Sequence, residues 1–139
     1  MSSHEVTIQV NNPIKKKLTS SRDWTEWFGL MKNHAITLGI WEYLDLDKEE
    51  VSKVEKPKRP VLPPANADTA IQTRFNLELK IFEMDYNDWR IASTNMNTFR
   101  RDLINSVDPA KITEYITELV DTRDVLKALE KDLAPTNQD

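Results

Sequence analysis

Apolar and aromatic residues recur every three or four positions over the second half of the chain. Nine of them follow one another at steps of 4, 3, 4, 3, 3, 4, 3 and 4, namely Phe75, Leu79, Phe82, Tyr86, Trp89, Ala92, Met96, Phe99 and Leu103. The average step of 3.5 residues is the heptad value, and it predicts one long helix. Either Asn66 or Asp68 would cap its first turn, because both side chains can accept a backbone N–H.

The length of this predicted helix conflicts with the size of a compact domain. A continuous helix of about 40 residues would be ~60 Å long. A compact chain of this size has a diameter below ~40 Å. Either the helix therefore bends near residues 85–88 or 93–97, or the molecule is elongated and buries the excess length against another copy.

A second stripe of the same kind follows Ser20, and its members are Trp24, Phe28, Met31, Ala35, Leu38 and Trp41. Ser20 and Asp23 have the spacing of a capping box, so we expect a helix to begin there. Gly39 lies within the stripe, where glycine weakens a helix, and it predicts a bend or a C-cap. Residues 40–46 would then form a separate helical turn, and the charged residues 47–56 a short exposed helix.

Prolines and caps divide the rest of the chain. Four prolines make residues 57–65 an extended connector between two helical blocks. Asp108 followed by Pro109 predicts the start of another helix, and Asp121 with Asp124 predicts the start of the last one. The sequence thus predicts an all-α fold of five or six helices, with one long central helix.

The two ends of the chain differ from this helical pattern. Residues 5–10 alternate apolar and polar side chains like a β-strand, and the turn-forming residues 11–13 end that pattern. We therefore expect a short extended or strand-like N-terminal arm over residues 1–18. A helical domain would follow over residues 19–136, and residues 137–139 would form a polar tail.

The composition excludes several classes of catalytic, metal and nucleotide site. The 139 residues include no cysteine, which removes disulfides, thiol nucleophiles and iron–sulfur clusters. Two glycines and two histidines leave neither a glycine-rich phosphate loop nor a histidine-rich metal centre. His34 has no acidic partner at a useful helical spacing, so we interpret it as a boundary or surface residue. We expect no enzymatic activity, cofactor, metal or small-molecule substrate.

The charge and hydropathy of the chain narrow the range of partners that we expect. The 19 basic and 23 acidic residues give a net charge of -4, which argues against a whole-surface nucleic-acid binder. Lys15, Lys16 and Lys17 are the candidate RNA contacts, although no aromatic residue is interleaved with them and solubilising charge is the favoured interpretation. No apolar run is long enough to span a membrane, and the polar start has no secretion signal, so we expect a cytoplasmic location.

The long aromatic stripe is the feature that points to a function. Most of the aromatic residues would be core, but a stripe longer than a compact domain is also typical of a self-association surface. The candidates for self-association are Phe75, Phe82, Tyr86, Trp89, Met96 and Phe99. The alternatives are a helical adaptor that binds another protein beside the tryptophan-rich helix, and a weak RNA-binding module.

A series of short signatures runs through residues 17–136. It consists of Lys17-Leu18-Thr19, Trp24-Thr25-Glu26-Trp27, Met31-Lys32, Gly39-Ile40-Trp41-Glu42-Tyr43-Leu44, Leu103-Ile104-Asn105-Ser106-Val107, Asp124-Val125-Leu126-Lys127-Ala128-Leu129 and Leu133-Ala134-Pro135-Thr136. This ordered series resembles the Gag proteins of copia-type retrotransposons, especially fungal ones. The signature residues expected in the core are Trp24, Trp27, Met31, Leu38, Trp41, Leu103, Ile104, Leu126 and Leu129.

The resemblance implies an all-helical capsid-type domain that self-assembles into a virus-like particle around the RNA of the element. Gag proteins of this kind often carry a Cys/His zinc knuckle for RNA, and this cysteine-free chain has none. RNA is thus an expected partner only through other residues, and the main expected partner is another copy of the chain. The resemblance also suggests either the N-terminal portion of a longer Gag or a domesticated derivative.

Overall fold

The computed structural model describes residues 14–119 and 121–135. These residues form two 3-10 turns and four α-helices, in the order η1 (Ser21–Asp23), α2 (Trp24–Thr37), η2 (Trp41–Tyr43), α3 (Thr69–Asn105), α4 (Pro109–Glu118) and α5 (Thr122–Leu133). The predicted all-α class is confirmed, but the predicted five or six helices are too many. The strand-like residues 5–10 and the tail 137–139 lie outside the described residues.

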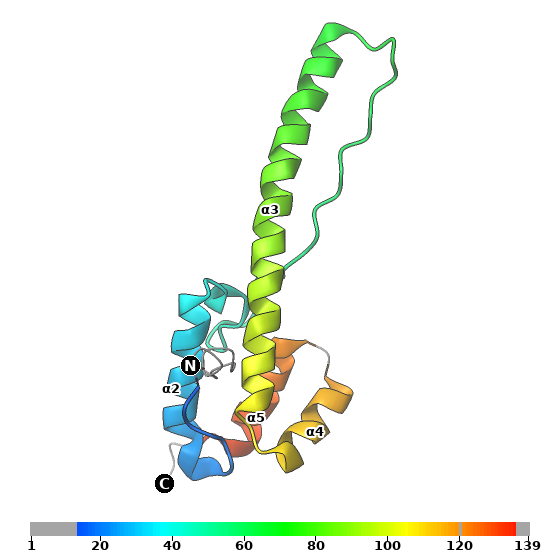
Figure 1. The fold of residues 1–139 in the computed structure, drawn as a ribbon. Helices are drawn as coiled ribbons and strands as arrows, with labels where there is room; N and C mark the ends of the chain where they lie inside the picture. Colours follow the sequence, from blue (N-terminus) through cyan, green and yellow to red (C-terminus); the bar gives the residue numbers. More distant parts are fainter. Residues whose placement is uncertain (1–13, 120, 136–139) are drawn as a thin grey trace, which may run out of the picture.

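The molecule is elongated, with a globular head and a projecting arm (Figure 1). The long helix α3 runs unbroken over 37 residues, which corresponds to about 55 Å. We call residues 14–44, 93–119 and 121–135 the head, and residues 69–92 of α3 the arm. Residues 51–65, which we call the strap, run beside the arm and away from the head. The helix is therefore continuous through both predicted bend sites and the molecule is elongated, while burial of the excess length against another copy stays a prediction.

The hydrophobic core lies entirely within the head. Its members come from α2, the last turns of α3, α4, α5 and the segments that join them: Ile14, Leu18, Trp24, Trp27, Met31, Ala35, Ile40, Leu44, Phe99, Leu103, Val107, Ile112, Val125, Leu126, Leu129 and Leu133. The segment before α2 closes this core, since the N–H of Leu18 donates to Ser106 O (2.8 Å) and the N–H of Asp108 donates to Leu18 O (2.9 Å).

Local capping signals explain where the helices begin and end. Asp68 Oδ1 accepts the N–H of Ile71 at 2.9 Å at the start of α3, and Asp108 Oδ1 accepts the N–H of Ala110 at 3.1 Å at the start of α4. After α2, Gly39 adopts φ 73°, and its N–H bonds to Ile36 O. Glycine takes this left-handed conformation without steric cost, which is why the helix ends there. The caps predicted at Asp68, Asp108 and Gly39 are confirmed.

The segment after the head does not form the helix predicted over residues 47–56. The described residues between η2 and α3 contain no helix, and the strap is extended along α3. Two physical reasons account for this. Only Val51 and Val54 are apolar in the predicted helix, too few to anchor it on a core. A connection to the far end of the arm also needs an extended chain, which covers about twice the distance per residue of a helix.

Candidate interaction surface

The arm carries apolar side chains on two opposite faces. One face, which we call the inner face, consists of Phe75, Leu79, Phe82, Tyr86 and Trp89, and strap cations approach the last three rings. Its rings pack in series, with centroids 5.8 Å apart for Phe82 and Tyr86 and 5.4 Å apart for Tyr86 and Trp89. The strap places Lys56 Nζ 5.6 Å from the centre of the Trp89 ring. Cations at this distance are attracted to the face of the ring.

Every third residue of the strap is partly buried. Val51, Val54, Pro57, Pro60 and Pro63 are partly buried, and the other residues of the strap are exposed. A period of three residues is that of a polyproline II helix, which turns one of its three edges toward a single surface. The strap therefore has the burial period of a proline-rich segment that lies on one surface, and its Lys56 and Arg59 approach the Tyr86, Trp89 and Phe82 rings.

The opposite face of the arm remains uncovered by the described residues. We call it the outer stripe: Leu77, Ile81, Met84 and Ile91, which are 61%, 51%, 68% and 48% exposed. Their steps of four, three and seven place them on one side of the helix, in the same heptad rhythm as the inner face. Single exposed apolar residues need no explanation, but a contiguous stripe indicates a binding surface.

Sequence reasoning missed the outer stripe although its signal was present. The apolar positions of two faces, each repeating every 3.5 residues, overlap along the chain, and the aromatic series hides the aliphatic one. Charged residues, Arg74 and Asp88, also occupy two positions of the aliphatic series. A search for a second apolar register on the same helix would have found it.

The six predicted self-association residues do not share one environment. Phe99 is fully buried in the head, and Met96 is partly buried against the same core. Phe75, Phe82 and Trp89 are partly buried on the inner face, where Tyr86 is 37% exposed. Phe99 is therefore unavailable to a partner, and the strap competes with any partner for the inner face.

The nine residues that the signature series placed in the core all pack in the core of the head. Trp24, Trp27, Met31, Leu103, Leu126 and Leu129 are buried, and Leu38, Trp41 and Ile104 are partly buried against them. Trp27 also donates its indole Nε1–H to Ser106 Oγ at 2.8 Å. These residues hold α2, α3 and α5 together rather than forming a surface.

The three adjacent lysines differ in how much they remain available. Lys16 Nζ lies 3.4 Å from Asp23 Oδ1 and 3.8 Å from Glu26 Oε1, so carboxylates already face it. Lys15 and Lys17 are exposed. The geometry leaves at most a small basic edge for contact with RNA phosphates.

His34 has an acidic partner that the sequence did not reveal. Its Nε2 lies 2.8 Å from Asp102 Oδ2, and its ring stacks on Phe99 with centroids 6.0 Å apart. Asp102 is only 2% exposed and also accepts from the Arg101 guanidinium at 3.2 Å. Interpreting His34 as a boundary residue without an orienting partner is thus wrong about the partner. The pair ties α2 to α3 across 68 residues of sequence.

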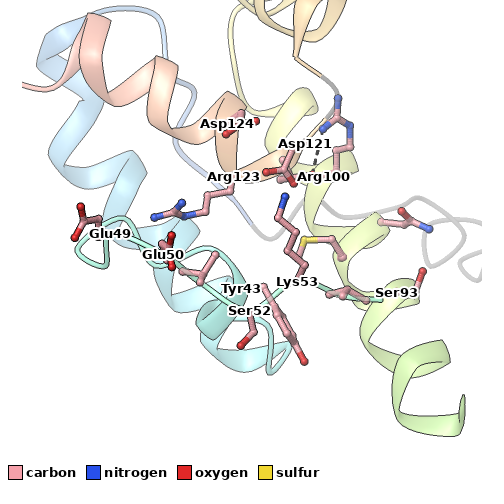
Figure 2. A pocket seen from close by; sticks show the side chains of 15 residues that line it. Tyr43, Glu49, Glu50, Ser52, Lys53, Ser93, Arg100, Asp121, Arg123 and Asp124 are labelled. Atoms are coloured by element: carbon pink, nitrogen blue, oxygen red, sulfur yellow. Dashed lines mark hydrogen bonds between the residues drawn. The ribbon is translucent and has the colours of Figure 1, made fainter. Parts of the chain in front are cut away.

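A hollow of about 700 Å³ lies where the strap leaves the head (Figure 2). Basic and acidic side chains alternate around it: Glu49, Glu50, Lys53, Arg100, Asp121, Arg123 and Asp124. Arg123 Nη2 donates to Lys48 O at 2.6 Å, and Arg100 Nη1 donates to Thr122 Oγ1 at 3.1 Å. These contacts join residues 45–48 and the C-terminal end of α3 to the start of α5. They give the arginines a structural role.

The structure and the comparisons add no chemistry to this picture. Across residues 14–119 and 121–135, no three His, Asp or Glu side chains gather into a group that could hold a metal ion. None of the helices in this part of the chain is both long and apolar enough to cross a membrane. The chain matches none of the protein-family models, curated proteins or solved structures with which it was compared.

Proposed function

We propose that the protein is a non-enzymatic structural protein that self-associates through its arm. The observation that carries this proposal is the outer stripe, which leaves Leu77, Ile81 and Met84 more than half exposed on a helix far from the core. Apolar surface of this kind is stabilised when a second surface covers it. An exposed apolar stripe on a long helix suits a contact between copies better than it suits catalysis.

The resemblance to copia-type Gag proteins gives the proposal its specific form. A capsid-type protein needs a stable domain and at least one surface that contacts other copies. The head, with its compact core, fits the first role, and the arm fits the second. In this form of the proposal, copies assemble in the cytoplasm into a particle around RNA, with Lys15 and Lys17 as minor phosphate contacts.

The test is the mass of the protein in solution at rising concentration, with negative-stain microscopy of the most concentrated sample. Sedimentation equilibrium should give masses above the 16.2 kDa of one chain. Ile81→Lys together with Met84→Lys should weaken association roughly tenfold or more, because each change brings a charge into a desolvated contact. A wild-type protein that stays monomeric at every concentration would contradict the proposal.

A matched control is available on the head. Ile36 on α2 is 53% exposed, close to the 51% of Ile81. Ile36→Lys is therefore the counterpart of Ile81→Lys at a similarly exposed isoleucine outside the arm, and association should remain at the wild-type level. A monomeric wild type that instead binds a different protein beside the tryptophan-rich helix α2 would favour the adaptor alternative.

A further inference from the structure

The outer stripe has a charge pattern that is complementary to itself. Arg74 and Asp88 each lie seven residues from Ile81, one before it and one after it. Seven residues are two helical turns, so both side chains share the face of the stripe. Both are exposed. Along this face a basic residue precedes the apolar Leu77, Ile81 and Met84, and an acidic residue follows them before Ile91.

We propose that two copies pair through this stripe as antiparallel helices, with a twofold axis close to Ile81. The inference rests on the proposed function and specifies its contact. In this arrangement Arg74 of one copy faces Asp88 of the other, twice by symmetry. A parallel arrangement would instead set Arg74 against Arg74 and Asp88 against Asp88 within the contact, where like charges are costly because they are desolvated.

The charged residues beside the stripe favour a parallel arrangement, but only weakly. Lys80 and Asp85 border the stripe on its two sides, where they would form ion pairs between copies only in a parallel arrangement. Both are exposed. Exposed ion pairs contribute little to stability, whereas charges within the contact are partly desolvated, so Arg74 and Asp88 decide the direction.

The length of the arm supports the same arrangement. Ile81 lies 12 residues after Thr69, where α3 begins, and 14 residues before Asn95, whose Nδ2 donates to Leu38 O where the helix enters the head. These distances are about 18 Å and 21 Å. An antiparallel partner centred on Ile81 would therefore bring its Thr69 opposite residue 93, at the edge of the head. The two heads would lie at opposite ends of the paired arms (Figure 1).

Cysteine cross-linking tests the direction, and the chain suits it because it contains no cysteine. Arg74→Cys and Asp88→Cys chains of different mass are mixed and oxidised. Antiparallel pairing predicts the mixed disulfide, because only then do the two positions approach within about 7 Å. A disulfide between two Arg74→Cys chains would indicate parallel pairing and overturn the inference. Glu83→Cys, on a side of α3 away from the stripe, is the control that should not cross-link.

Charge reversal tests the ion pairs in the otherwise natural protein. Arg74→Asp should weaken association roughly tenfold, and adding Asp88→Arg to the same chain should restore it, because the pairs form again with their signs exchanged. Parallel pairing predicts no change from either variant. Persistent association with neither cross-link nor charge effect would overturn the inference and leave the proposed function standing. A monomeric wild type would overturn both.

Discussion

The head and the arm contain similar apolar side chains but bury them to very different degrees. All the buried apolar residues of the described chain lie before residue 45 or after residue 98. Eight of the nine exposed large apolar residues lie between these limits, and the ninth is Ile36. The head therefore buries its apolar side chains within the described residues, whereas the arm has a surface that these residues do not cover. The contrast shows that the period of apolar residues can predict a helix without predicting what each face of the helix contacts.

The largest expected difference between the two regions comes from the same substitution made in each. Trp27 is fully buried and hydrogen-bonded in the head, so Trp27→Ala should lower the free energy of unfolding by about 3–5 kcal/mol. That is a large part of the ~5–15 kcal/mol that stabilises a typical domain. Urea unfolding followed by circular dichroism measures it.

The matched control is Trp89→Ala in the arm. Trp89 is only partly buried and packs against Tyr86 and the strap residue Lys56. Its loss should cost about 1 kcal/mol, mostly the ring and cation contacts. If the two variants lost equal free energy of unfolding, the arm and the head would unfold as one core and would not be separate regions.

Two aspartates, one in the head and one in the arm, repeat this comparison with a smaller expected loss of stability. Asp102 is buried and accepts from both His34 and Arg101, so Asp102→Ala should cost about 1.5–3 kcal/mol. Asp88 is exposed on the arm, and Asp88→Ala should change the stability of the monomer by less than about 0.5 kcal/mol. The same urea titration at low protein concentration compares them. If Asp102→Ala cost less stability than Asp88→Ala, the His34–Asp102 contact would not hold α2 to α3.

The parts of this fold that could be predicted from the sequence depend on neighbouring residues. The start of α3 at Asp68, the start of α4 at Asp108 and the end of α2 at Gly39 all follow from side chains within a few positions of the helix end. The long helix follows from the period of its apolar residues. These signals are local, and no distant segment had to be known.

The rest depends on contacts between distant segments. Asp102 lies 68 residues from His34, and Leu18 pairs with Val107 across most of the chain, so no spacing within one helix could reveal either contact. The residues 47–56 were wrongly assigned to a helix for the same reason, because only the position of the arm requires them to be extended. The aromatic stripe was assigned to self-association without knowledge of the strap that lies on it.

The smallest expected effect on stability concerns two capping carboxylates, Asp23 before α2 and Asp68 before α3. Asp23 accepts the hydroxyl of Thr19 at 2.6 Å, the N–H of Thr19 at 3.0 Å and the N–H of Ser20 at 3.2 Å. The bonds from Thr19, followed by Lys16 and Ser20, hold the pKa of this carboxyl well below its ordinary value of 3.8. A carboxyl with a lowered folded pKa adds stability above its unfolded pKa and loses it as the pH falls.

Asp23→Asn should therefore be less stable than the wild type near neutral pH, and the difference should shrink as the pH falls from about 5 to about 2. Urea midpoints measured across this range give the difference directly. The control is Asp68→Asn at the tip of the arm, where the unfolding of the head should not depend on the cap of a distant helix turn. A difference that stays constant down to pH 2 would mean that the amide loses packing rather than charge at Asp23. A strong effect of Asp68→Asn would mean that the tip of the arm contributes to the stability of the head.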